Sequence, residues 1–224
     1  VNSQWNTQCL YFGHIDQDIN GIPNWHRNCL TGKLAFRPIQ KWHDIPDFND
    51  ELGDIKGVWE ASRFGWMIAF SQRIVCGNID ASSDVNKWLS DWVKHNPTYL
   101  GMNWKCGQEA SIRVMHLAMT AKILHQLDST TPSLLSLIKA HLKRISPTIM
   151  YALAQDNNHG TSEAVALYIG GSWLVNNGDN DGIKWQAQGL KLLENRAEHL
   201  IEEDGSFSQY SMTYHRVMLD SYNM

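Results

Sequence analysis

Hydrophobic residues recur at helical spacing from about residue 57 to the end of the chain. This pattern predicts helices over 58–76, 82–95, 107–126, 133–154, 161–176, 181–203 and 211–224. Pro147 lies inside the fourth of these segments and should kink or split it, because proline lacks a backbone N–H and clashes with the preceding turn. No strand pattern separates the predicted helices, and short connections favour antiparallel neighbours. The pattern therefore predicts an all-α domain.

The first 55 residues differ from the rest, because Asn, Asp, Gly and Pro are frequent and aromatic residues are scattered among them. This composition predicts an irregular segment over 1–55 that wraps around a helical domain over 56–224. Within 162–173 the apolar residues cover more than one helix face. Such a pattern is typical of helices that pack on two sides, as in a double-layered α/α toroid. The helical pattern still runs at Met224, so we expect the chain to be part of a longer protein.

Charge and cysteine content narrow the possible functions. The net charge of −4 and the pI of about 6.2 argue against a general nucleic-acid-binding protein, which would carry a basic surface. No apolar run reaches the roughly 18 residues that a membrane span requires. The cysteines lack zinc-ligand spacing and could be free thiols or disulfides; they are Cys9, Cys29, Cys76 and Cys106. We therefore expect no metal, no cofactor, no nucleic-acid partner and no membrane span.

Two polar segments next to predicted helices carry the candidate chemistry, Asp156–Gly160 and Tyr210–Arg216. Asn and His side chains can donate hydrogen bonds to a carboxylate, and Tyr, with an ordinary pKa of about 10, can carry a proton. Such a site suits β-elimination on a uronic-acid sugar. The alternatives are a helix cap at Asn157 and Asn158 and a buried tyrosine with a satisfied hydroxyl at Tyr214.

A third group of candidates surrounds the start of the helix predicted over 107–126. Arg113 follows Glu109 by one helical turn, so the two could form a surface ion pair worth a few tenths of a kcal/mol. Alternatively, Arg113 could bind a substrate carboxylate or sulfate with two parallel hydrogen bonds. Asn103 and Trp104 precede this helix and could line a cleft, with Trp104 either a platform for a sugar ring or a core residue.

Several blocks of sequence, in this order, resemble the heparinase II/III-like polysaccharide lyases, which include heparinase III and the oligoalginate lyases. The blocks are Gly101–Trp104 with Glu109–Arg113, then Asn157–His159, then Asp204–Phe207 leading into Ser211 and Tyr214–Arg216. Asp54–Lys56, Trp59, Glu60 and Arg63 also resemble the family, and we expect Glu60 and Arg63 to be structural. The resemblance covers roughly residues 54–220.

The resemblance implies an N-terminal incomplete (α/α) toroid, followed in the family by a C-terminal domain of antiparallel β-sheets that is absent from this chain. It implies that Asn158 and His159 neutralise the uronate carboxylate and that Tyr214 is the general acid and base. Further substrate contacts are expected from Arg113, Trp104, Asn103, Asn157, His215, Arg216 and Glu109. The expected partners are an anionic polysaccharide such as heparan sulfate, heparin or alginate, and the β-sheet domain. The expected location is the bacterial periplasm or the exterior.

Two other function classes remain open. A glycoside hydrolase on an α/α scaffold would need two suitably separated carboxylates. The chain has Glu60, Glu109, Glu163 and Asp204, but none lies in a recognisable hydrolase motif. A non-catalytic glycan-binding relative would be expected to have lost a member of the Asn158, His159 and Tyr214 set, and this chain keeps all three.

Overall fold

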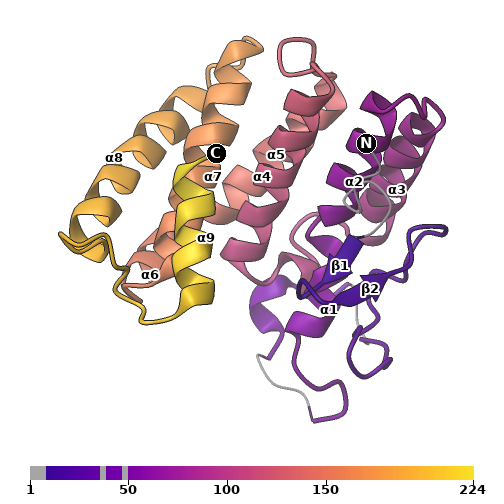
Figure 1. Ribbon diagram of the computed structural model, residues 1–224, viewed down its shortest axis with the longest axis horizontal. Coiled ribbons are helices and arrows are strands. Elements are labelled where there is room, and N and C mark those ends of the chain that lie inside the picture. Colours follow the sequence, from indigo (N-terminus) through magenta and orange to yellow (C-terminus); the bar gives the residue numbers. More distant parts are fainter. Residues whose placement is uncertain (1–8, 36–38, 47–49) are drawn as a thin grey trace. The chain divides into compact units, whose positions relative to one another are not determined.

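The structure is a computed structural model that describes residues 9–35, 39–46 and 50–224. Residues 1–8, 36–38 and 47–49, all within the predicted wrapping segment, lie outside the described residues. The fold is mostly helical (Figure 1). Its elements are β1 (Cys9–Tyr11), β2 (Ile15–Gln17), η2 (Trp42–Asp44), α1 (Lys56–Ser62), α2 (Gly65–Val75), α3 (Ala81–His95), η3 (Met102–Trp104), α4 (Gly107–Ile123), α5 (Pro132–Ile145), η4 (Ser146–Thr148), α6 (Ile149–Leu153), α7 (Asn158–Asn176), α8 (Gly182–Leu200) and α9 (Met212–Tyr222).

The chain divides into two compact units. The first unit contains the described residues up to Glu109 together with Met119–His125. The second unit contains Ala110–Ala118 and Gln126–Met224. In the part of the chain that the structure describes, no helix is both long and apolar enough to cross a membrane.

Aromatic side chains form the core of the first unit. Trp66 is fully buried, and its ring lies 5.1 Å from that of Trp88 and 6.0 Å from that of Trp25. The indole of Trp25 also donates a 2.7 Å hydrogen bond to the carboxylate of Asp91 in α3. Aromatic pairs at these distances stabilise a core beyond the area they bury. They fix α2, α3 and the loop that carries Trp25. In the same unit β1 pairs with β2 in antiparallel register, with Leu10 opposite Asp16.

The helix predicted over 58–76 is two helices, α1 and α2, because the chain turns sharply at Phe64. Phe64 has φ of 66°, in the left-handed region, which costs a non-glycine residue about 1–2 kcal/mol. Its ring is fully buried and lies edge-on to Trp92 at 4.9 Å. Burial of a phenylalanine contributes about 1.5–3 kcal/mol and offsets this cost. The uninterrupted helix was therefore a wrong prediction, since tertiary packing decides the break.

The second unit is organised around α7, which packs against α5, α6, α8 and α9. Four consecutive α7 residues, Ala164–Leu167, are all buried, which confirms the prediction that this helix packs on more than one side. Pro147 splits the predicted 133–154 helix as expected: α5 ends at Ile145, the turn η4 holds the proline, and α6 begins at Ile149.

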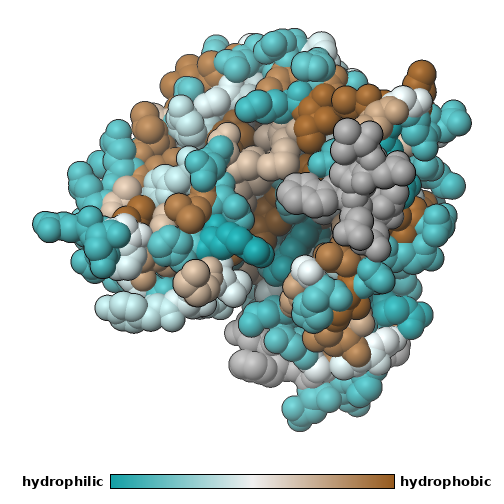
Figure 2. All heavy atoms as spheres, viewed as in Figure 1, coloured by the Kyte–Doolittle hydropathy of each residue, from teal (hydrophilic) through white to brown (hydrophobic). Residues whose placement is uncertain are grey.

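The backbones of α7 and α8 approach closely through glycines. A Cβ atom placed on Gly189 of α8 would lie 2.7 Å from the carbonyl oxygen of Ala164 and 2.8 Å from Cα of Tyr168. Gly171 of α7 is equally close to the backbone of α8. The other side of α8 is mostly hydrophilic, with scattered hydrophobic residues (Figure 2). One face of α8 thus packs directly on α7 while the opposite face meets solvent.

Gly189→Ala should lower the free energy of unfolding by about 1–3 kcal/mol, because the added methyl group meets backbone that cannot rotate away. Gly21→Ala is the matched control, since its Cβ would meet nothing within 4 Å. Chemical denaturation of both variants measures the difference. Equal unfolding midpoints for the two variants would contradict the close approach of α7 and α8.

A buried polar pair joins α4 to α5 within the second unit. Nε of Arg113 donates a 2.9 Å hydrogen bond to Nε2 of His141, and both side chains are fully buried. Nδ1 of His141 lies 2.8 Å from the carbonyl oxygen of Leu137 and therefore carries the ring proton. Burial, with the adjacent Arg113 charge, lowers the pKa of His141 to about 3, so the imidazole is neutral.

This lowered pKa predicts a specific acid sensitivity. Because the unfolded imidazole takes up a proton near pH 6.5 and the folded one does not, its stabilising contribution is present above pH 6.5 and lost below it. Between pH 7 and pH 5 the loss should be about 2 kcal/mol. In denaturation curves at both pH values, His141→Gln should remove this part of the pH dependence. The exposed control His199→Gln should keep it, and identical pH dependence in both variants would refute the assignment.

Candidate functional site

The segment Asp156–Gly160 forms the start of α7. Asn157 is the N-cap, and its side-chain oxygen accepts a 2.9 Å hydrogen bond from the backbone N–H of His159. Asn158 and His159 are therefore the first two residues of the helix, which begins three residues earlier than the predicted 161. The capping alternative thus describes Asn157, while Asn158 and His159 are consecutive residues of the first turn.

The turn before this cap is held by an ion pair. Asp156 adopts φ of 44°, a left-handed conformation that is uncommon for residues other than glycine. Its carboxylate accepts a 2.8 Å hydrogen bond from Nη1 of Arg196, a largely buried residue of α8. A Cβ atom on Gly160 would lie 3.3 Å from Cδ of the same arginine. Arg196 therefore packs against the turn and stabilises its conformation. Sequence reasoning missed it because no motif marks it and 40 residues separate it from Asp156.

The start of α9 is fixed next to the start of α7. Oε1 of Gln209 accepts a 2.9 Å hydrogen bond from the backbone N–H of Asn158. Behind this contact, Leu200, Phe207 and Met218 form a small apolar cluster that fastens the α8–α9 connection to α9. Figure 1 shows α9 alongside α7, with both helices beginning at the same end of the second unit.

This arrangement places the three predicted catalytic residues in the first turns of two adjacent helices. Asn158 is only 3% exposed, His159 is partly buried, and Tyr214 in the first turn of α9 is 40% exposed. His215 is partly buried and Arg216 is exposed. A helix N-terminus favours negative charge through its dipole.

Two of the backbone N–H groups at the start of α7 are used within the protein. The N–H of Asn158 donates to Gln209, and that of His159 donates to Asn157. These two groups therefore do not bind a carboxylate at this turn.

The predicted contact residues Asn103 and Trp104 belong to the interior of the first unit. The Asn103 amide donates to the carbonyl oxygen of Trp25 at 3.0 Å and to Oδ1 of Asn96 at 2.8 Å. The Trp104 indole donates to the carbonyl oxygen of Asn96 at 3.0 Å. Neither residue has any exposed surface. Of the two readings of Trp104, the structure supports the core residue and gives no surface for a sugar to stack on.

Glu109 and Arg113 also lie in the interior. The carboxylate of Glu109 accepts two hydrogen bonds from Arg63, of 2.8 and 2.7 Å, and Arg63 is also paired with Glu60. This buried arrangement agrees with the structural role expected for Glu60 and Arg63. Arg113 is fully buried in the second unit, where it binds His141. Among the described residues, no group of three or more His, Cys, Asp or Glu side chains is placed to hold a metal ion.

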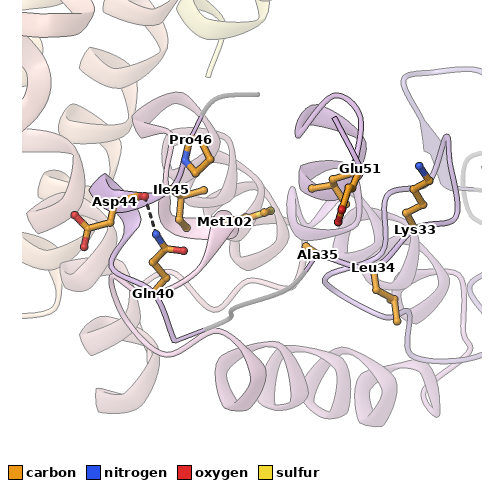
Figure 3. A pocket seen from close by; sticks show the side chains of 10 residues that line it. Lys33, Leu34, Ala35, Gln40, Asp44, Ile45, Pro46, Glu51 and Met102 are labelled. Carbon is orange, nitrogen blue, oxygen red and sulfur yellow. Dashed lines mark hydrogen bonds between the residues drawn. The ribbon is translucent and has the colours of Figure 1, made fainter. Parts of the chain in front are cut away.

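A pocket of about 870 Å³ lies in the first unit (Figure 3). Its described lining is largely apolar, with Ile45, Leu52 and Met102, and includes the charged residues Lys33 and Glu51. The side chain of Gln40 crosses one end and donates a 2.7 Å hydrogen bond to the carbonyl oxygen of Asp44. None of the site residues predicted from the sequence is among its described lining residues.

Comparison with known proteins identifies the family. No curated protein and no solved structure matches the chain. The family model described as Heparinase II/III N-terminus matches residues 47–224, which is well over half of the chain and includes both α7 and α9. The chain therefore belongs to the heparinase II/III family and carries its N-terminal domain.

Proposed function

We propose that this chain is the toroid domain of a polysaccharide lyase that cleaves a uronic-acid-containing polysaccharide by β-elimination. The observation that supports the proposal best is the joining of two helix starts in the second unit. The hydrogen bond between Asn158 and Gln209 holds the turn with Asn158 and His159 next to the segment that leads into α9, whose first turn carries Tyr214. Family membership supports the same chemistry.

The first requirement of the reaction is a more acidic C5 proton. Removal of this proton places negative charge on the uronate carboxylate, which becomes enolate-like in the transition state. Hydrogen-bond donors placed beside that charge lower the barrier. Asn158 and His159 supply an amide and an imidazole on one helical turn, and the dipole of α7 points its positive end at the same place. These two residues would neutralise the carboxylate.

The second requirement is proton transfer at C5 and at the leaving oxygen. The C5–H and C4–O bonds break, a C4–C5 double bond forms, and the leaving oxygen receives a proton. Tyr214 is exposed enough to reach a sugar and can donate this proton from its phenol. In a syn reaction its phenolate would also accept the C5 proton, which a nearby cation favours. His215 and Arg216 follow it directly in the chain.

The wider assignment rests on the family resemblance. We propose that the helices form an incomplete (α/α) toroid and that a C-terminal β-sheet domain of the same protein completes the cleft. The substrate class is a heparan sulfate-, heparin- or alginate-like chain, and the working location is the bacterial periplasm or the exterior. The β-sheet domain would contribute a further catalytic group.

Tyr214→Phe should lower the rate of uronate cleavage by about 100-fold or more, because the variant keeps the ring and loses the transferable proton. Asn158→Ala should cause a similar loss through the unneutralised carboxylate. Tyr210→Phe is the matched control, since this tyrosine is 96% exposed and precedes the start of α9. The measurement is the ultraviolet absorbance of the unsaturated uronate, with heparan sulfate, heparin, alginate, hyaluronan and chondroitin as substrates.

The assay should use the natural protein with any segment that follows residue 224. Chain cleavage without unsaturated product would indicate a hydrolase. Polysaccharide binding without cleavage would indicate a glycan-binding relative. A Tyr214→Phe enzyme as active as the Tyr210→Phe control would rule out the proposed role of Tyr214.

A further inference from the structure

Glu163 is a buried acid on the helix that carries the candidate site. It lies in α7, one turn after His159, and only 3% of its surface is exposed. Its Oε2 atom is buried and has no hydrogen-bond partner among the described residues. A carboxylate in such surroundings costs several kcal/mol unless it is paired or protonated. The proposed reaction gives Glu163 no role, although it is the buried acid nearest in sequence to the carboxylate-binding pair.

Burial keeps Glu163 mostly neutral near pH 7. Burial raises its pKa to about 8, and the attraction of Arg144 from α5 only partly opposes this. Arg144 also donates a 3.0 Å hydrogen bond to the hydroxyl of Thr148.

The other helices packed on α7 add no second ion-pair partner for Glu163. Arg196 of α8 is paired with Asp156. Tyr222 of α9 donates a 2.9 Å hydrogen bond to the carbonyl oxygen of Leu193. Tyr151 of α6 is exposed to solvent.

Helix geometry directs this acid toward the site. Side chains in an α-helix lean toward its N-terminus, so a residue covers the turn that precedes it. Residues four apart have Cβ atoms about 6 Å from each other. This geometry directs the buried side chain of Glu163 toward the turn that carries His159. An anion bound by Asn158 and His159 would lie within the range of its charge.

We propose that Glu163 is a positioning residue of the uronate site. The site binds the anionic sugar while Glu163 is neutral and rejects the sugar once Glu163 ionises. The proposal rests on the function proposed above. A neutral acid adds no repulsion and lets Asn158 and His159 bind the carboxylate. An ionised one places a second negative charge one helical turn from His159, and the buried position of Glu163 leaves little water to screen the repulsion. The effect falls on substrate binding, hence on KM more than on kcat.

The test is the pH dependence of KM between pH 6 and pH 9. The wild-type KM should rise by up to about tenfold between pH 8 and pH 9, as expected when the ionised form of a group with a pKa of about 8 does not bind the sugar. Glu163→Gln keeps the shape and cannot ionise, so its KM should stay within about twofold of the wild-type value at pH 7 and remain flat above pH 8. The control Glu194→Gln, at an exposed position of α8, should follow the wild type. A Glu163→Gln profile that rises like the wild type would overturn the proposal.

Unfolding measurements provide a readout that does not depend on activity. Because the folded-state pKa is raised from 4.5 to about 8, the wild type should lose stability relative to Glu163→Gln as pH rises through this window. Glu163→Met, which also cannot ionise, repeats both tests if the glutamine variant folds poorly. Parallel stability profiles for the wild type and these variants would overturn the proposal. No cleavage of any uronate polymer would overturn both proposals, whereas cleavage with an unchanged KM profile would overturn only the role of Glu163.

Discussion

The candidate site depends on one hydrogen bond, from the backbone N–H of Asn158 to the side chain of Gln209. It satisfies a donor at the start of α7 that the helix itself cannot pair, and it holds the segment that leads into α9. The apolar cluster of Leu200, Phe207 and Met218 adds a second attachment, between the end of α8 and α9. The hydrogen bond joins the start of α7 to the segment that leads into α9, 51 residues further along the chain.

The interior of the second unit contains several buried polar groups. The neutral imidazole of His141 accepts a hydrogen bond from the guanidinium group of Arg113. Arg196 forms an ion pair with Asp156 at the left-handed turn, and Glu163 lies buried in α7. Buried polar groups destabilise a fold unless they are paired or neutral. Close packing of α7 on α8 through glycines stabilises the same unit and keeps the first turn of α7 in place. Polar groups kept at such a cost are common at functional sites.

Much of this fold could be predicted from the sequence because helical periodicity and punctuation are local signals. Pro147 splits its helix as expected, and the predicted helices appear with boundaries shifted by a few residues. The break at Phe64 could not be predicted, since its left-handed turn is stabilised by rings contributed from other helices. The site motif was visible because Asn158, His159 and Tyr214 occur in short recognisable blocks. Arg196 and Glu163 lie in no such block, and only their burial and contacts single them out. Trp104 shows the opposite case, because sequence alone could not tell a sugar platform from a core residue.

The most direct test of this account is a crystal structure of the Tyr214→Phe protein with a uronate oligosaccharide bound. The account predicts that the uronate carboxylate contacts the side chains of Asn158 and His159, with the glycosidic oxygen next to the ring at position 214. An oligosaccharide bound instead in the pocket of the first unit, lined by Lys33, Glu51 and Met102, with the start of α7 empty, would contradict it.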